Sequence, residues 1–194
     1  LLRFIGSLPQ SAAAQAAYAV GYTELFSLVT WTSVGLMGAV AAVAGQNLGA
    51  GRPERVMSAI AVASRIGLTV AAVVGVLFLA VPRLLLGAFG MTSGEVVEVG
   101  VQLLRFLAVS GCFVSVALVH TGGLQGTGDT KSPLYISIVS QVLVPLGLCA
   151  ILQSMDRLVP AAIWSAILAG HFTRSLLSVW RFRQGRWRHI EVHI

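Results

Sequence analysis

The amino-acid sequence predicts an all-α, polytopic helical membrane protein, and three observations support that fold class. Hydrophobic residues make up 56% of the 194-residue chain and charged residues only 10%, whereas about a quarter of the residues in a soluble domain are charged. The chain contains five apolar runs long enough to cross a hydrocarbon core as helices, which takes about 20 residues. Most lysines and arginines lie in short segments between those runs.

The five expected membrane spans cover residues 12–44, 56–81, 96–119, 134–152 and 158–180. Together they form one helical unit over residues 11–182. Residues 1–10 are expected to be the tail of a truncated transmembrane helix and an outer loop, and residues 183–194 a basic cytoplasmic tail. The first span is longer than a straight crossing needs, so we expect it to tilt, protrude or bend near Gly35 and Gly38.

The distribution of basic residues predicts the orientation. Seven of them lie in the loops after the first and third spans and in the C-terminal tail: Arg52, Arg55, Lys131, Arg181, Arg183, Arg186 and Arg188. Because cytoplasmic loops are enriched in Lys and Arg, the C-terminus is expected in the cytoplasm of a protein integral to the cytoplasmic membrane. The net charge of +6 does not indicate nucleic-acid binding, since the basic residues are not interleaved with aromatic ones on one surface. The expected partner is membrane lipid.

The sequence carries no signature of an enzyme. There is no nucleophile elbow, no pair of carboxylates within a span and no ATP-binding segment. The stretch GTGDTK is not a phosphate-binding loop, because Asp129 and Thr130 separate the last glycine from the lysine. Cys112 and Cys149 lie inside apolar runs and indicate neither a disulfide framework nor a metal site. No cofactor is expected.

Two predicted cytoplasmic loops share a glycine-rich design, GQNLGAGRP at residues 45–53 and GLQGTGDTKSP at residues 123–133. Their glycines permit left-handed backbone angles, and a proline can begin the next helix without losing a hydrogen bond. The expected turn residues are Gly45, Gln46, Gly49, Gly51, Pro53, Gly123, Gly126, Gly128, Asp129 and Pro133. Asp129, Thr130 or Ser132 is expected to cap the fourth span.

AVAGQNLGAGRPER, followed about seventy residues later by GGLQGTGDTKSPL, resembles the C-terminal half of the multidrug and toxic compound extrusion (MATE) family, whose superfamily also holds polysaccharide flippases. The resemblance covers essentially the whole chain, from the end of the seventh family helix through the twelfth. It implies one six-helix lobe of a twelve-helix transporter, whose partner is the missing N-terminal lobe. Such transporters export organic, often cationic, compounds in exchange for protons or sodium.

Glu24 is the main candidate for ion coupling or substrate binding, because it is the only acidic residue well inside a predicted span. A carboxylate costs several kcal/mol in hydrocarbon, so it is expected to face the bundle interior or a watery cavity. Its neighbours Tyr22, Ser27 and Trp31 add hydroxyl groups and an aromatic face that a cation could use. The alternative is a glutamate that only fixes helix packing.

Four further polar residues interrupt the apolar spans. Gln102 and Gln141 are interpreted as making hydrogen bonds between helices, with a ligand contact as the alternative. Arg105 is expected to extend to the outer interface, with a role in the cavity as the alternative. Arg174 is expected to reach the inner interface.

The chain departs from part of the family. Some members carry an intramembrane acid on the tenth family helix, but the matching third span has only Glu98, at its outer end. The resemblance therefore does not favour a sodium site in this lobe, and proton coupling, centred on the N-terminal lobe, is the preferred expectation. Two alternatives stay open: a lipid-linked saccharide flippase, whose cavity would need more basic groups than Arg105, and a membrane scaffold subunit that transports nothing.

Overall fold

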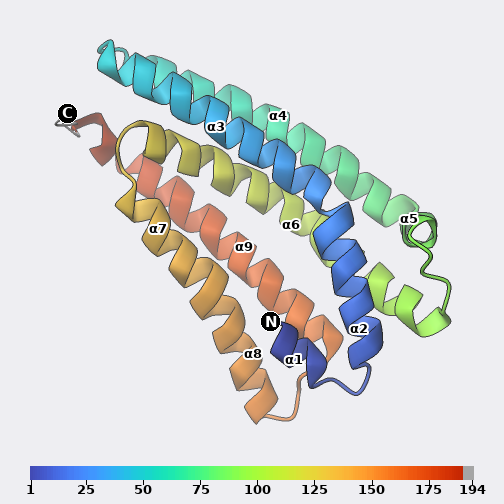
Figure 1. The fold of residues 1–194 in the computed structure, drawn as a ribbon. Helices are drawn as coiled ribbons and strands as arrows, with labels where there is room; N and C mark the ends of the chain where they lie inside the picture. The colour runs from blue at the N-terminus through green and yellow to red at the C-terminus, as the bar shows by residue number, and fades with distance from the viewer. Residues whose placement is uncertain (190–194) are drawn as a thin grey trace.

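The computed structural model describes residues 1–189, and all regular structure in that range is helical, which confirms the all-α class (Figure 1). The segments are α1 (Leu2–Gly6), α2 (Ser11–Ala17), the π-helical η1 (Tyr18–Leu25), α3 (Ser27–Gly49), α4 (Pro53–Ala80), α5 (Pro82–Ala88), α6 (Gly94–Gly126), α7 (Lys131–Ser137), the π-helical η2 (Ile138–Leu143), α8 (Val144–Ser154), α9 (Pro160–Arg183) and the 3-10 helix η3 (Arg186–His189). The end of the predicted basic tail, residues 190–194, lies outside the described residues.

Four helical segments are long and apolar enough to cross a membrane: Ser11–Gly49, Pro53–Ala80, Gly94–Gly126 and Lys131–Ser154. Each contains most or all of one of the first four predicted spans. Helix α9 has 24 residues, a sufficient length, but it is not among these four because polar and basic side chains interrupt its apolar residues. A fifth crossing by α9 therefore stays a prediction.

The first long segment changes direction at η1, between α2 and α3 (Figure 1). There the Phe26 N–H donates to the Gly21 carbonyl oxygen, five residues back, at 3.0 Å, which replaces the α-helical pattern with a wider turn. The expected bend near Gly35 and Gly38 is not found, since both glycines lie within α3. The bend lets α2 pack against α6.

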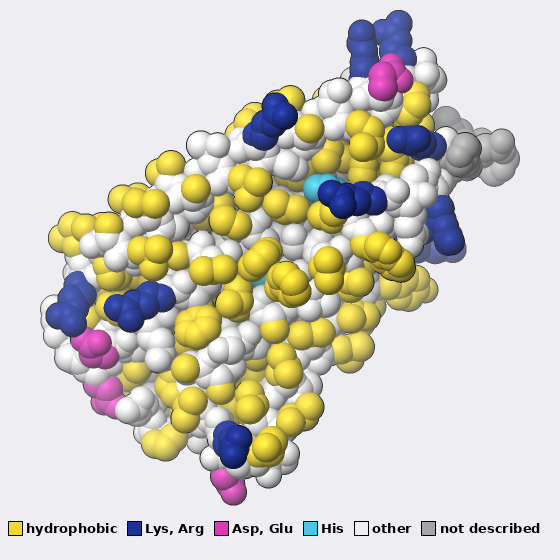
Figure 2. All heavy atoms as spheres, turned by 180° about the vertical axis from the view of Figure 1, so that it is seen from behind, with side chains coloured by type: hydrophobic (Ala, Val, Ile, Leu, Met, Phe, Trp, Pro, Cys, Tyr) yellow, Lys and Arg dark blue, Asp and Glu magenta, His cyan; other side chains and the backbone are white. Residues whose placement is uncertain are grey.

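Helix α6 is the centre of the bundle and packs against α3, α4 and α9 (Figure 1). Its Leu103 and Leu104 are completely buried. Many large apolar side chains, such as Leu79 and Ile151, are instead exposed. In Figure 2 hydrophobic side chains cover the middle of the molecule, while most charged side chains gather toward its ends. This surface is suited to lipid, which needs no polar covering.

A stripe of small residues brings α4 against α6. Gly67, Ala71 and Gly75 of α4 are all buried. A Cβ atom added to Gly75 would lie 3.1 Å from the Ala108 carbonyl oxygen, and one added to Gly67 would overlap the Ser115 hydroxyl. Small residues at such spacing allow helix backbones to meet in a membrane, and the structure shows that approach.

The glycine-rich segments contain fewer turn residues than the sequence predicts. Only Gly51 (φ +69°) and Gly128 (φ +92°) adopt the left-handed backbone conformation. Pro53 begins α4 as expected, whereas Pro133 lies within the first turn of α7. The other predicted turn glycines, together with Gln46, lie inside helices α3 and α6: Gly45, Gly49, Gly123 and Gly126.

Three of those helical glycines serve close packing instead. A Cβ atom at Gly126 would strike the Ala41 carbonyl oxygen, and one at Gly123 would lie 2.5 Å from Ile60 Cδ1. A Cβ atom at Gly45 would lie 3.0 Å from the Gly126 carbonyl oxygen. The two glycine-rich segments are therefore in contact with each other, although about seventy residues separate them in the sequence.

The α3–α4 turn, the α6–α7 turn and the C-terminal end of α9 lie at one end of the molecule, which we call the basic end (Figure 1). Those three places carry the seven basic residues assigned to the cytoplasmic side. The arrangement is compatible with the predicted sorting of charge, but which side of a membrane this end faces stays a prediction.

Candidate functional site

At the basic end, Asp129 joins the α6–α7 turn to α9. Its Oδ1 accepts a hydrogen bond from the Ser132 N–H at 3.1 Å, so Asp129 provides the predicted cap at the start of α7. Its Oδ2 accepts a bond from Arg181 Nε at 2.9 Å and forms an ion pair with the Arg181 guanidinium at 2.7 Å. Burial alone would raise the pKa of this carboxyl, but the bonds from Ser132 and the bond and charge of Arg181 hold the pKa below its usual value.

Glu24 lies in η1, and its side chain is exposed on the surface of the described bundle. Glu24 is therefore not buried among the described helices, and the expectation that it faces the interior of a complete bundle or a watery cavity stays a prediction. Trp31, about two turns further, is 72% exposed. The Ser27 hydroxyl is partly buried and donates to the Glu24 carbonyl oxygen rather than to the carboxylate. Glu24 and Trp31 thus belong to an outward surface, and any group that they bind would approach from outside these helices.

Tyr22 of η1 is only partly exposed and faces α9. Its hydroxyl lies 3.4 Å from Nε2 of the buried His171. The Tyr22 ring stacks on Tyr18, with ring centroids 4.9 Å apart, and Tyr18 stacks on Trp164 at 6.3 Å. Tyr22 therefore packs against the hydrophobic core, whereas Glu24, two residues further along η1, is exposed.

Helix α9 carries a column of enclosed polar atoms that have no hydrogen-bond partner within residues 1–189: Trp164 Nε1, His171 Nδ1, Arg174 Nε and Ser178 Oγ. Gln141 of η2 adds a fifth, because its Nε2 is also enclosed without a partner. The hydrogen bond between helices expected for Gln141 is thus not made by this nitrogen. Buried polar groups normally have partners, so water or a ligand would complete this column.

Arg174 lines a pocket of about 490 Å³ between α3, α6, α7 and α9. Its Nε is enclosed, and about nine residues separate it from the end of α9, or roughly 14 Å at 1.5 Å per residue. The residue as a whole is only partly buried, so the expectation that Arg174 reaches the inner interface stays a prediction. Long cationic side chains near helix ends usually extend to water, and this one lines a pocket that also includes exposed residues near the α6–α7 turn, Gln125 and Thr130.

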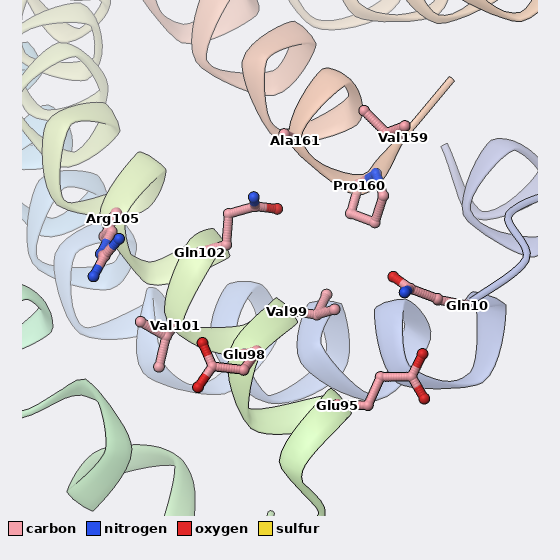
Figure 3. Close-up of a pocket in the computed structure, with 10 residues that line it drawn as sticks. All are labelled: Gln10, Glu95, Glu98, Val99, Val101, Gln102, Arg105, Val159, Pro160 and Ala161. Atoms are coloured by element: carbon pink, nitrogen blue, oxygen red, sulfur yellow. The ribbon is translucent and has the colours of Figure 1, made fainter. Parts of the chain in front are cut away.

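A second pocket, of about 400 Å³, lies at the opposite end and brings together Gln102 and Arg105 (Figure 3). Figure 3 shows the Gln102 side chain extending from α6 toward the start of α9. Glu95 and Glu98 line the same pocket, and Glu98 pairs with Arg83 at 2.6 Å on the surface. Arg105 is exposed, so this pocket combines both signs of charge near water.

The predicted site residues therefore form separate groups rather than one constellation. Glu24 and Trp31 face outward, Gln102 and Arg105 line the second pocket, and Gln141 lies on η2. In the sequence, His171 and Arg174 lie three residues apart on one face of the fifth predicted span, and Ser178 extends that face by one turn. The spacing does not reveal that these polar groups are enclosed without partners among the described residues. Within residues 1–189, no group of three or more His, Cys, Asp or Glu side chains could hold a metal ion.

The long apolar helices with lipid-suited surfaces define a polytopic helical membrane protein. A family model described as MatE matches residues 1–151, which is more than half of the chain. The chain belongs to the MATE family. Because this is a family of transporters, membership also confirms the prediction that the chain is not an enzyme.

Relatives and a solved structure agree with this assignment. Proteins named "Probable multidrug resistance protein NorM" match from Thermotoga maritima, 23% identical over 83% of this chain, and from Mesorhizobium japonicum, 30% identical over 80% of it. The chain covers 34% of the length of each. The crystal structure of the eukaryotic MATE transporter AtDTX14 matches with a TM-score of 0.83 and 20% identity, over 96% of this chain and 41% of that one. That likeness shows the fold.

Proposed function

We propose that the chain is the C-terminal lobe of an antiporter that exports organic, often cationic, compounds across the cytoplasmic membrane in exchange for protons or sodium. Family membership supports the transporter class, and the names of the curated relatives support multidrug export. The chain spans about a third of the length of those relatives, which supports a further lobe. The shared position of the basic residues supports a cytoplasmic C-terminus.

The exposed carboxylate of Glu24 is the observation that carries this proposal. Glu24 lies within a segment apolar enough to cross a membrane, and its side chain is exposed on the described bundle. Facing lipid there would cost several kcal/mol. Such a residue is stable if its surface borders a water-filled cavity or another part of the transporter. Both are places where an ion or an organic cation can reach a carboxylate.

The local structure of η1 fits an ion-coupling role for Glu24. A π-helical segment is rare and occurs frequently at functional sites, and Glu24 lies inside one. Trp31 is exposed on the following helix and could contact an organic cation through its ring face. In this proposal, protonation of Glu24 and binding of the cation exclude each other, so each side of the membrane exchanges one for the other.

The test uses the protein expressed from its complete reading frame in inverted membrane vesicles. With a proton or sodium gradient imposed, wild-type vesicles are expected to accumulate ethidium, an organic cation. Glu24→Gln is expected to abolish that accumulation. Glu54→Gln, at the exposed first turn of α4, is the matched control and is expected to leave it intact. Wild-type accumulation with undiminished activity in Glu24→Gln would remove Glu24 from the coupling step.

A second candidate function, a lipid-linked saccharide flippase, is favoured by one observation. Arg174 lines a pocket between α3, α6, α7 and α9, and a pyrophosphate needs cationic groups within the transport path. A single arginine is a weak basis for binding a group that carries several charges. Proteoliposomes separate the candidates: flipping of a pyrophosphate-linked lipid without cation exchange would support the flippase, and neither activity would support the scaffold.

A further inference from the structure

The pocket at Arg174 has the size and composition of a ligand site. Its volume, about 490 Å³, lies within the 300–1,000 Å³ range of small-molecule sites. Four helices contribute to its wall, so it is a feature of the bundle rather than of one loop. The lining combines apolar side chains, including Val34, Met37 and Leu118, with polar ones, among them Gln125 and the hydroxyls of Thr121 and Ser137.

The charge of Arg174 is not balanced by this wall. No aspartate or glutamate lines the pocket. Within the part of the chain that the structure describes, the ion pairs are Arg83–Glu98 and Arg181–Asp129, so Arg174 has no carboxylate partner there. Its Nε atom is enclosed and lacks a hydrogen-bond acceptor. An arginine at membrane depth is costly unless it is paired or hydrated. The guanidinium of Arg174 is therefore available to donate hydrogen bonds to a ligand that enters the pocket.

Within residues 1–189 no side chain supplies an acceptor to the Nε atom of Arg174. His171 lies one helical turn before Arg174 on α9, and its ring already contacts Tyr22. The Thr30 hydroxyl, on the pocket wall, donates to the Phe26 carbonyl oxygen at 3.2 Å. The guanidinium itself is a planar set of donors that matches carboxylate and phosphate oxygens.

We propose that this pocket binds an amphipathic organic anion, whose acidic group pairs with Arg174 and whose hydrocarbon part packs against Val34, Met37 and Leu118. This goes beyond the proposed function, because it names a ligand of opposite charge and a site distinct from the exposed surface of Glu24. The proposal of an anion site depends on neither ion coupling nor the direction of transport, so a binding measurement is sufficient to test it.

The experiment uses the protein from its complete reading frame in nanodiscs of phosphatidylcholine. Calorimetric titration compares naphthalene-2-carboxylate with naphthalene-2-methanol, which has nearly the same shape but no charge. Wild-type protein is expected to bind the carboxylate at least about tenfold more tightly, the lower limit for a charge-assisted hydrogen bond. Equal affinities for the two compounds would overturn the proposal, whatever the outcome of the ethidium experiment.

Two variants assign the selectivity to Arg174. Arg174→Gln is expected to lose the preference for the carboxylate, whereas Arg65→Gln is expected to keep it. Arg65 is the matched control because it is an exposed arginine inside α4 that does not line this pocket. Arg174→Lys keeps the charge without the planar pair of donors, so an intermediate preference is expected. If Arg174→Gln does not fold, the lysine variant decides, and an unchanged preference in it contradicts the role of the guanidinium.

A final comparison distinguishes a soluble anion from a lipid headgroup. The wild-type titration is repeated in nanodiscs that contain phosphatidylglycerol, and the carboxylate is expected to bind with similar affinity. A large loss of affinity there that also depends on Arg174 would mean that an anionic lipid occupies the pocket, which would overturn the assignment to a soluble organic anion.

Discussion

The two sides of helix α6 differ in how they are packed. On the side of α3 and α4, glycines bring helix backbones into direct contact, as at Gly122 against Met37 and Gly126 against Ala41. On the side of α9, a pocket opens at Arg174 and four enclosed polar atoms of α9 lack partners among the described residues, although the α4–α6 contact also contains such an atom, Ser115 Oγ. Protein interiors are normally close-packed, so the first side is the usual case and the second is the exception.

This difference in packing indicates which side of α6 can rearrange when water or a ligand binds. Where backbones are in direct contact, as at Gly126 and Ala41, no ligand fits between them. Unpaired polar atoms are stabilised when water or a ligand arrives, and four of them lie on α9. We therefore expect the glycine contacts of α6 with α3 to stay fixed, and the surroundings of the pocket at Arg174 to be the place where water or a ligand changes the packing.

The sharpest test of the close-packed side is Gly126→Ala. The new methyl group would strike the Ala41 backbone, which cannot rotate away as a side chain could, so a loss of about 3 kcal/mol is expected, the upper range for overpacking. Gly147→Ala is the matched control, because it lies in α8 with nothing within 4 Å of an added Cβ atom. Thermal melting of the purified proteins in detergent measures both.

If the two alanine variants melt at the same temperature, the contrast between the sides of α6 fails. Gly147→Ala is expected to be neutral or slightly stabilising, since alanine favours a helix more than glycine does. A loss in Gly147→Ala as large as that in Gly126→Ala would mean that glycine matters throughout the bundle and not at one interface.

A smaller effect is expected at the joint between α7 and α9. Asp129→Asn removes a buried charge partner of Arg181 and should cost about 2 kcal/mol, the scale of hydrogen bonds to charged groups. The comparison is Glu98→Gln, which breaks the ion pair with Arg83. Those side chains are 66% and 73% exposed, and such pairs contribute about 0.2–1 kcal/mol. Similar melting losses in both variants would contradict the importance of burial.

The sequence predicted the helices better than the contacts between them. Apolar runs identify spans because lipid requires about 20 apolar residues whatever the neighbours are. It could not distinguish a glycine needed for its backbone angle, such as Gly128, from one needed for its missing side chain, such as Gly126. That distinction depends on which helix lies opposite.

The dependence on neighbouring helices also explains why the sequence identified candidate site residues without their surroundings. Glu24 was noticed because its charge is rare in an apolar run, but the direction of its side chain depends on the π-helical turn at η1. Arg174 was assigned to the interface because of its place in the sequence, whereas the packing of α3, α6 and α7 around α9 places it in the wall of a pocket and encloses its Nε atom. A sequence shows which residues are charged, but it does not show which side chains surround them in the folded protein.

The smallest expected effect concerns pH at the Asp129 joint. The folded protein lowers the pKa of this carboxyl from its usual 3.8, so the charged form is favoured by folding. Its contribution is complete above the unfolded pKa and is lost as pH falls through the lower folded pKa. The melting difference between wild type and Asp129→Asn should therefore be constant from about pH 7 to 5 and shrink below about pH 4. A difference that persists in full at pH 3 would show that the asparagine disturbs packing by itself, and that the joint is not held by charge.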